Sequence, residues 1–215
     1  MYDFVTHTWN TIKGKCPHGC SYCYMHRFKQ NKVRFDSKEL RTDLGKGNFI
    51  FVGSSCDMFA ETIPHDWIAN TLIKAWESSD NRYLFQSKNP FRISCYREGL
   101  PDSSVVCTTI ETNRWIPSVM GNSPNQEDRA RGMEYMAYHF DRYVTIEPVI
   151  DFDLVPMVEL IKRCEPIQVN IGADSGNNHL PEPSADKLLA LIDELSKFTT
   201  IAKKRNLRRI LGDIS

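Results

Sequence analysis

The sequence predicts an α/β fold in which a parallel β-sheet is covered by outer helices. Three observations support this prediction. Short apolar stretches rich in β-branched residues recur along the chain, amphipathic segments lie between them, and the intervals are long enough for the crossovers that parallel strands require. Because no repeat, low-complexity segment or linker interrupts the 215 residues, we expect one domain spanning residues 1–215.

The expected elements follow from the periodicity of apolar residues. Six short apolar stretches are predicted strands: Phe4–Trp9, Phe49–Gly53, Tyr83–Gln86, Val105–Ile110, Tyr143–Glu147 and Ile167–Gly172. Four segments with helical spacing are predicted helices: Asp66–Ser79, Gln126–Phe140, Leu154–Cys164 and Ser184–Phe198. In the first helix, Ile68, Leu72 and Trp76 share one face, and Asp66 is the expected N-cap. Shorter helices are expected in residues 24–30, 37–44 and 90–98.

Composition excludes several classes of function. Lysine plus arginine equals aspartate plus glutamate, 27 each, so no overall field attracts nucleic acid or a membrane. The chain shows no signal-peptide pattern and no apolar run near the ~20 residues that span a bilayer. Seven cysteines, an odd number, then favour free thiols in a reducing compartment. We therefore expect a cytoplasmic protein without membrane contact.

The cysteine loop, residues 16–23, is the most informative segment. Cys16, Cys20 and Cys23 have the spacing C-x3-C-x2-C, with Tyr22 before the last cysteine. Three thiolates can hold three corners of an iron–sulfur cluster and leave the fourth iron open, as catalytic sites require.

A zinc knuckle is the other interpretation of this loop. Zinc in structural sites takes four ligands, and His18 or His26 would be the fourth. Because we expect the loop to be too tight for His18 to turn inward, the spacing favours the iron–sulfur cluster. None of the remaining cysteines has metal-ligand spacing, and Cys107 and Cys164 are expected to be buried apolar residues.

Residues 16–23 resemble the signature of the radical S-adenosylmethionine enzymes, and further segments resemble small phage- and bacteria-encoded, DUF5131-like members with mostly unassigned substrates. The resemblance implies an open, partial (β/α)6 barrel. It also implies a four-iron four-sulfur cluster on Cys16, Cys20 and Cys23. The open iron of that cluster would chelate the amino and carboxylate groups of S-adenosylmethionine, and Tyr22 would pack near the adenine.

Each predicted strand ends in small, polar or charged residues. Ligands of open α/β sheets bind at the carboxyl edge of the strands, so we expect one shared polar site there. Besides the cysteine loop, the candidates are Gly53, Ser54, Ser55, Cys56, Asp57, Lys88, Glu111, Asn113, Glu147, Gly172, Asp174 and Ser175.

The resemblance assigns cofactor-binding roles to part of this set. Gly53–Ser55 stands where the family often has a Gly-Gly-Glu segment that binds the methionine amino group. Because this chain lacks the glutamate, Ser54 and Ser55 or their carbonyls are expected to bind that group, with Asp57 supplying the negative charge.

Two later strand ends complete the expected cofactor site. Glu111 and Asn113 match the region that contacts the ribose, whose hydroxyls suit carboxylate and amide partners. Gly172 lets the backbone approach a ligand, with Asp174 and Ser175 as polar contacts.

Three side chains are candidates for chemistry on the substrate. Lys88 would bind the methionine carboxylate or an acidic substrate group, or is simply solvated. Glu147 would face the cofactor or substrate, or else neutralise a nearby basic residue. Cys56 would donate a hydrogen atom to a substrate radical, or is a passive packed thiol.

Two more segments carry expectations. The basic run Lys203–Arg209 is read as the solvated face of a C-terminal segment, with a phosphate-contacting patch as the alternative. Residues 113–124, with Trp115 and Met120 expected at the surface, form the candidate lid over the site.

The sequence therefore predicts an enzyme that uses one electron from an external reductant of flavodoxin or ferredoxin type. It would cleave S-adenosylmethionine to methionine and a 5′-deoxyadenosyl radical, which abstracts hydrogen from an unidentified nucleotide, nucleic-acid or protein substrate. The alternatives are a non-catalytic zinc module that contacts nucleic acid, and a cluster that only transfers electrons or senses redox state.

Overall fold

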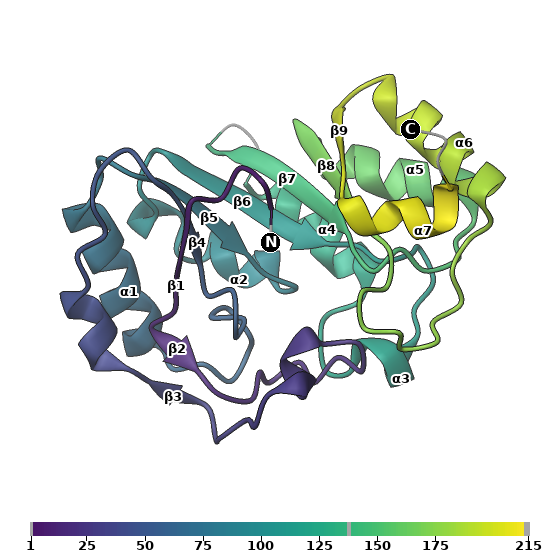
Figure 1. Ribbon diagram of the computed structural model, residues 1–215. Coiled ribbons are helices and arrows are strands. Elements are labelled where there is room, and N and C mark those ends of the chain that lie inside the picture. Colours follow the sequence, from purple (N-terminus) through teal and green to yellow (C-terminus); the bar gives the residue numbers. More distant parts are fainter. Residues whose placement is uncertain (1, 137–138, 213–215) are drawn as a thin grey trace.

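The computed structural model describes residues 2–136 and 139–212 and contains a seven-stranded sheet in which every neighbouring pair is parallel (Figure 1). The strand order is β1-β4-β5-β6-β7-β8-β9. The bounds are β1 His7–Trp9, β4 Phe49–Val52, β5 Arg82–Gln86, β6 Ser104–Thr109, β7 Asp141–Ile146, β8 Gln168–Ile171 and β9 Thr200–Lys203. All six predicted strands are confirmed, with the first shorter than expected, and the α/β class is confirmed as an open, partial barrel with a parallel sheet and outer helices.

The longer helices pack against one face of the sheet (Figure 1). The longer ones are α1 His65–Glu77, α4 Gln126–Glu134, α5 Leu154–Arg163 and α6 Ala185–Ser196. Short helices are η1 Tyr24–Arg27, η2 Ser37–Arg41, α2 Pro90–Ser94, η3 Arg97–Gly99, α3 Pro117–Met120, η4 Arg205–Leu207 and α7 Arg208–Leu211. The predicted helix Gln126–Phe140 extends over residues 137 and 138, which lie outside the described residues, and α4 ends at Glu134.

One detail of the first predicted helix is wrong. The N-cap of α1 is Pro64 rather than Asp66, and Asp66 lies in the first turn, where a negative charge also favours the helix dipole. Of the three residues at helical spacing, Ile68 and Leu72 are buried, and Trp76, near the end of α1, is 43% exposed.

Three strands were not predicted. β9 adds a seventh strand beside β8, and β2 Ile12–Lys13 pairs with β3 Arg34–Phe35 in a separate antiparallel ribbon that flanks the cysteine loop. β2 and β3 have two residues each, too few to show an alternating apolar pattern, and β9 runs directly into the basic run.

The two faces of the sheet bury different cores because side chains alternate along a strand. Phe85 and Val106 point to the larger core between sheet and helices. Leu84 and Val105 point to the opposite face, where Tyr2 of the N-terminal segment packs against them. The N-terminal segment therefore covers part of the sheet face that lies opposite the helices.

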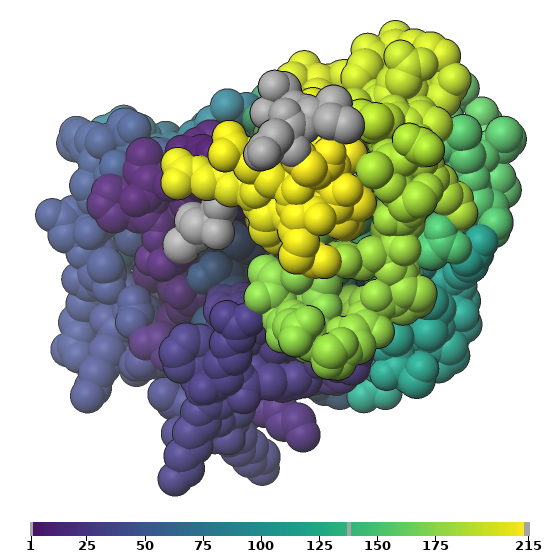
Figure 2. All heavy atoms as spheres, turned by 45° about the vertical axis from the view of Figure 1, so that its right-hand side comes forward, coloured from purple at the N-terminus to yellow at the C-terminus, as the bar shows by residue number. Residues whose placement is uncertain are grey.

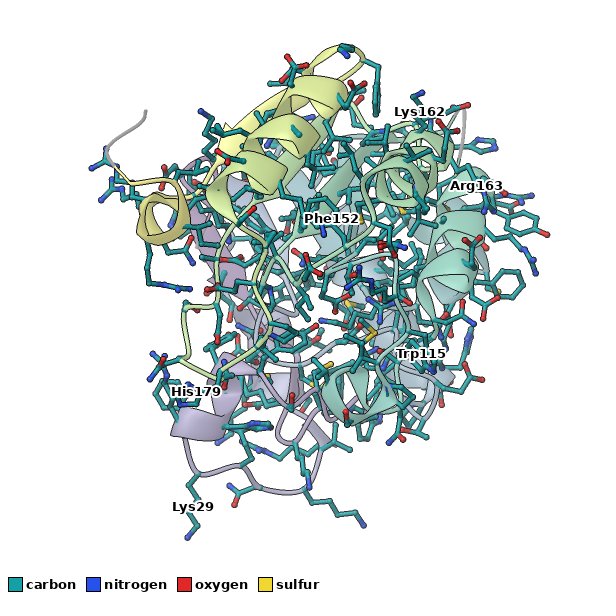
Figure 3. All side chains as sticks on the ribbon, turned by 90° about the vertical axis from the view of Figure 1, so that its right-hand side faces the viewer. Lys29, Trp115, Phe152, Lys162, Arg163 and His179 are labelled. Atoms are coloured by element: carbon teal, nitrogen blue, oxygen red, sulfur yellow. The ribbon has the colours of Figure 1, made fainter. Side chains whose placement is uncertain are left out.

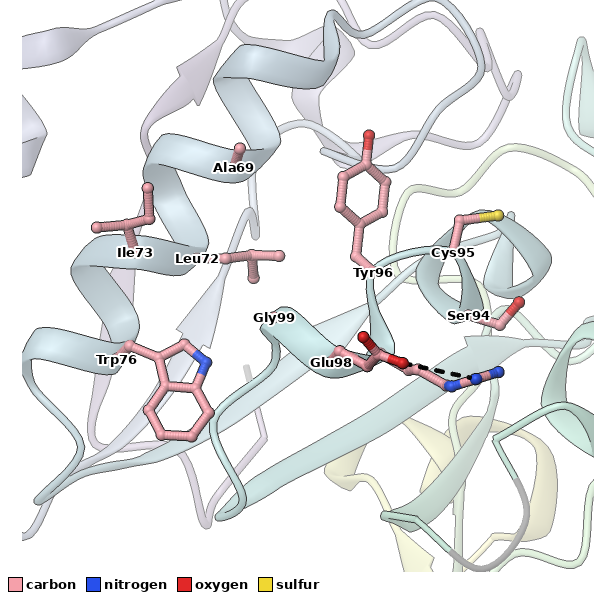
Figure 4. A pocket seen from close by; sticks show the side chains of 10 residues that line it. Ala69, Leu72, Ile73, Trp76, Ser94, Cys95, Tyr96, Glu98 and Gly99 are labelled. Atoms are coloured by element: carbon pink, nitrogen blue, oxygen red, sulfur yellow. Dashed lines mark ion pairs between the residues drawn. The ribbon is translucent and has the colours of Figure 1, made fainter.

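The described residues include no helix long and apolar enough to cross a membrane. The described surface does have a hollow of about 500 Å³ outside the sheet, between α1 and residues 94–99 (Figure 4). Ile73, Trp76 and Tyr96 line it, and Arg97 lies 3.8 Å from Glu98 beside it. It contains no predicted site residue.

Candidate functional site

A cavity of about 430 Å³ opens at the carboxyl edge of the sheet, and it is visible as a hollow in Figure 2. Strands β4 to β9 each contribute to its wall near or just beyond their carboxyl ends. The predicted site residues among its lining are Cys16, Cys20, Tyr22, Cys23, Gly53, Ser54, Ser55, Cys56, Asp57, Lys88, Glu147, Asp174 and Ser175. The structure thus brings most of the predicted set to one cavity.

The segment that contains α3 supports the cysteine loop through backbone hydrogen bonds. Ser21 N donates to Val119 O at 2.9 Å, and Asn122 N donates to His18 O at 2.7 Å. Gly121 has φ +60°, and a Cβ there would lie 2.2 Å from His18 O, so only glycine permits this approach. The expected lid is therefore wrong in part: Trp115 is exposed as predicted, but Met120 is buried and its segment supports the loop.

The donor set of the loop fits an iron–sulfur cluster. Cys16, Cys20 and Cys23 are free thiols that share the wall of one cavity. Among the described residues, no three His, Cys, Asp or Glu side chains are placed to hold one metal ion. A single zinc ion needs its thiolates about 2.3 Å from one point. A four-iron cluster takes one thiolate on each of three irons, and three free thiols on one short loop supply that donor set.

His18 corrects one expectation about this loop. It turns inward, is buried, and its Nε2 lies 2.8 Å from Asp57 Oδ2. The turn is possible because the loop backbone is held by residues 119–122 instead of closing tightly on itself.

Asp57 connects three loops of the cavity wall. Its Oδ2 also accepts from the Ser87 hydroxyl at 2.9 Å and from Lys88 N at 2.8 Å, while Oδ1 accepts from Phe59 N at 2.9 Å. Burial raises the pKa of Asp57, but His18 and the other hydrogen bonds outweigh it and leave the pKa below its ordinary value. The carboxylate holds the cysteine loop against the loops that follow β4 and β5.

Tyr22 is the first member of a buried hydrogen-bond network that continues through Glu111 to Arg129. Its hydroxyl donates to Glu111, and Glu111 accepts from Arg129 at 2.7 Å with both side chains fully buried. Lys88 Nζ lies 3.8 Å from Glu111 and 5.2 Å from the centre of the Tyr22 ring. Glu111 therefore lies behind the cavity wall and positions two residues that line it, instead of lining it as expected for a ribose ligand.

The segment after β4 turns at Gly53, which has φ +74°, and its residues Gly53, Ser54 and Ser55 line the cavity. The hydroxyls of Ser54 and Ser55 lie 3.3 and 3.0 Å from Asn10 Oδ1, and Ser54 O accepts from the Tyr24 hydroxyl at 2.9 Å. Both hydroxyls thus have a partner within the protein.

Cys56 is buried beside Cys16 at the cavity wall. A hydrogen bond between the two thiols lowers the pKa of Cys16, and this bond together with burial raises the pKa of Cys56. The hydrogen-donor role of Cys56 stays a prediction.

Glu147 has both of the properties expected of it. It lines the cavity, and it forms an ion pair with Lys204 from the end of β9. A Cβ on Gly172 would lie 2.7 Å from Glu147 Oε1, so the glycine makes room for this carboxylate rather than for a ligand.

The remaining predicted residues divide between the cavity and the surface. Asp174 accepts from Gly176 N at 2.9 Å and orders the loop after β8, and Ser175 O accepts from Arg27 at 2.7 Å. Asn113 instead lies 3.2 Å from Asp153 Oδ2 and is absent from the cavity lining.

A sequence profile of the family described as "Protein of unknown function (DUF5131)" matches residues 2–185. The chain belongs to this family. No curated protein matches it.

Solved structures similar to this DUF5131 protein are forms of spore photoproduct lyase. A cysteine-to-serine mutant has a TM-score of 0.67 and 10% identity, over 92% of this chain and 76% of the other. A double mutant with bound AdoMet and dinucleoside spore photoproduct has a TM-score of 0.58 and 10% identity, over 89% of this chain and 61% of the other. These likenesses establish the fold.

Sequence reasoning missed four residues of the DUF5131 site: Tyr2, Asn10, Arg129 and Lys204. Arg129 lies inside a predicted helix, where arginine is ordinarily solvated, yet its guanidinium also donates to Thr109 O at 2.7 Å. Lys204 was present in the basic run but not singled out from it. The signal for Asn10 was its place directly after the first strand.

Proposed function

We propose that this chain is a radical S-adenosylmethionine enzyme that carries a four-iron four-sulfur cluster on Cys16, Cys20 and Cys23. The observation that carries the proposal is the position of these three free thiols on one wall of the cavity at the carboxyl edge of the partial barrel. When bound, the cluster and S-adenosylmethionine would supply methionine and a 5′-deoxyadenosyl radical after one-electron reduction, and that radical would abstract hydrogen from the substrate.

The protein's own residues bind and orient the cofactor in this proposal. The Gly53 turn offers backbone groups to the methionine amino group, and the Tyr22 ring offers a face to the adenine. The ammonium of Lys88 lies beside the Tyr22 ring and 3.8 Å from Glu111, beyond hydrogen-bond distance, so it can also bind the methionine carboxylate. Burial of these groups strengthens their electrostatic interactions because little water competes for them.

The floor of the cavity is polar and suits a nucleotide-like substrate. The Tyr2 hydroxyl donates to Gln86 Oε1 at 2.7 Å and lies 2.6 Å from the Thr145 hydroxyl. Glu147 and Lys204 stand at the same end of the cavity. Similar solved structures carry a dinucleoside ligand, which supports this substrate class. An external one-electron reductant of flavodoxin or ferredoxin type, a single domain over residues 1–215 and a cytoplasmic location complete the proposal.

The test is the iron and sulfide content of protein prepared without oxygen. Wild type and Cys95→Ala, which alters an exposed cysteine away from the cavity, should both be brown and contain iron and sulfide in equal amounts. Cys16→Ala, Cys20→Ala and Cys23→Ala should each lose most of the iron. Zinc in place of iron in the wild type would overturn the proposal in favour of a structural zinc module.

A further inference from the structure

Positive charge is concentrated in two segments of this electrically neutral chain. Residues 4–35 contain six lysines and arginines and no aspartate or glutamate. Residues 203–209 contain five lysines and arginines and no acidic residue. Because the whole chain has as many acidic as basic side chains, the rest of the molecule has a negative balance and these segments stand out electrostatically.

Both segments border the cavity. Lys15, directly before the cysteine loop, and His26 of η1 line it, and Lys204 lines it from the end of β9. In Figure 2 the dark violet segment that contains η1 and the yellow C-terminal segment lie on either side of the hollow. Lys204 is paired with Glu147 and Arg209 with Glu182, so a polyanion at the cavity mouth would be held mainly by the cations of residues 4–35.

The cations of the first segment are available for such contacts. Lys15, Lys29 and Lys32 are exposed, and none of them has an acidic side chain within 4.0 Å in the part of the chain that the structure describes. Figure 3 shows Lys29 pointing away from the body of the protein. Lys13 differs, since Asp36 and Glu39 at 2.8 and 2.6 Å already neutralise it.

Two exposed aromatic rings lie among these cations. Tyr24 is 48% exposed and Phe28 is 59% exposed, both in or next to η1. The hydrogen bond from the Tyr24 hydroxyl to Ser54 O fixes its ring at the rim of the cavity. Flat rings beside lysines are what unstacked bases and their phosphates require, whereas an acidic peptide needs only the charges.

We propose that this face, made of Lys15, Tyr24, Phe28, Lys29 and Lys32, binds a single strand of nucleic acid across the cavity mouth. The lysines contact phosphates and the two rings stack on bases, and a nucleotide between them enters the cavity. A single strand fits because a base inside a duplex reaches neither the rings nor the cavity. This inference deepens the proposed function. The reaction of the nucleotide in the cavity rests on that function, whereas binding of the strand needs no radical chemistry.

The experiment measures binding of the full-length protein, with its cluster reconstituted, to a fluorescent single-stranded DNA of ~12 nucleotides over a range of salt concentrations. Lys29→Glu/Lys32→Glu should weaken binding at least about tenfold and reduce the slope of log affinity against log salt by about 2. The matched control, Lys162→Glu/Lys197→Glu, changes the net charge equally on the outer helices and should bind like wild type. Phe28→Ala should weaken binding about tenfold without changing the salt slope, because it removes stacking and no charge.

Further arms distinguish the ligand. Tight binding of DNA or of RNA of the same sequence supports the inference, and the difference between them reports the contribution of the 2′-hydroxyl. Equal losses of affinity in the two double variants would overturn the inference and indicate nonspecific electrostatic attraction. Displacement of the strand by polyglutamate at equal charge would also overturn it and indicate an acidic protein partner. Formation of 5′-deoxyadenosine is measured on the same samples. Binding of the strand without formation of 5′-deoxyadenosine contradicts only the proposed function. Formation of 5′-deoxyadenosine without binding of the strand contradicts only this inference.

Discussion

The guanidinium of Arg129 donates to the carboxylate of Glu111 at 2.7 Å, and neither side chain is exposed to solvent. The pair joins α4 to the end of β6 and, through Glu111, to Tyr22 and Lys88 at the cavity. Burial raises the pKa of Glu111, but Arg129 and Lys88 outweigh it, so the pKa lies below its ordinary value. The carboxylate therefore stays charged and depends on its partners.

Arg129→Met should destabilise the protein by about 3–5 kcal/mol, because it leaves a buried carboxylate without its main partner. The free energy of unfolding in denaturant measures this. Adding Glu111→Gln should recover part of the loss, since the uncompensated charge disappears. Arg131→Met, on the same helix but exposed and 4.0 Å from Asp128, should change stability by less than about 1 kcal/mol. Equal effects of the two arginine variants would contradict this role for Arg129.

Gly172→Ala should cost about 1–3 kcal/mol, because the new methyl group would overlap the Glu147 side chain at 2.7 Å. Gly99→Ala is the matched control, since its nearest neighbour is the flexible end of Leu72 at 3.4 Å. It should lie within about 0.5 kcal/mol of wild type. Thermal unfolding of both variants compares them, and unchanged stability of Gly172→Ala would show that Glu147 moves aside freely.

Arg114→Gln should raise the pKa of Asp153. Arg114 lies 2.6 Å from this carboxylate and, with Asn113, holds its pKa at about 2 instead of the ordinary 3.8. Because the pKa of Asp153 is lower in the folded than in the unfolded protein, its ion pair with Arg114 stabilises the fold fully above pH 3.8. This contribution is lost as the pH falls through about 2. Carbon NMR titration of the Asp153 carboxyl should show the shift toward 3.8 in the variant. An unchanged titration curve would mean that Arg114 has no influence on it.

Tyr22→Phe and Tyr22→Ala separate the two features of this residue. Phenylalanine keeps the ring near Lys88 and removes only the hydroxyl that donates to Glu111. If the ring contacts adenine, Tyr22→Phe should bind S-adenosylmethionine within a few-fold of wild type, and Tyr22→Ala should bind about tenfold more weakly. Isothermal titration of the reconstituted protein measures both. Similar affinities of the alanine variant and wild type would remove Tyr22 from the cofactor site.

The features of the fold that depend on local sequence patterns could be predicted. Six of the seven strands of the sheet, the four long helices and the convergence of strand-end residues on one cavity follow from apolar periodicity and the geometry of parallel sheets. β9 was missed because its four residues run directly into the basic run. The pairing of Arg129 with Glu111, 18 positions apart, depends on tertiary packing and leaves no local pattern.

The polar partners within the site were also beyond local patterns. The spacing of the cysteines predicted their shared cavity, but the inward turn of His18 depends on Asp57, which is 39 positions away. The support of the cysteine loop depends on Gly121, which is about a hundred positions away. Such contacts are fixed only when the whole chain has folded.

The central claim is that the three thiols of the cysteine loop support cleavage of S-adenosylmethionine. Its most direct test is the amount of 5′-deoxyadenosine formed when the anaerobically reconstituted protein is reduced with dithionite in the presence of S-adenosylmethionine. We expect product with the wild type and with Cys95→Ala, and none with Cys20→Ala. Iron-loaded wild type that yields no 5′-deoxyadenosine, or a Cys20→Ala protein with full activity, would contradict the account.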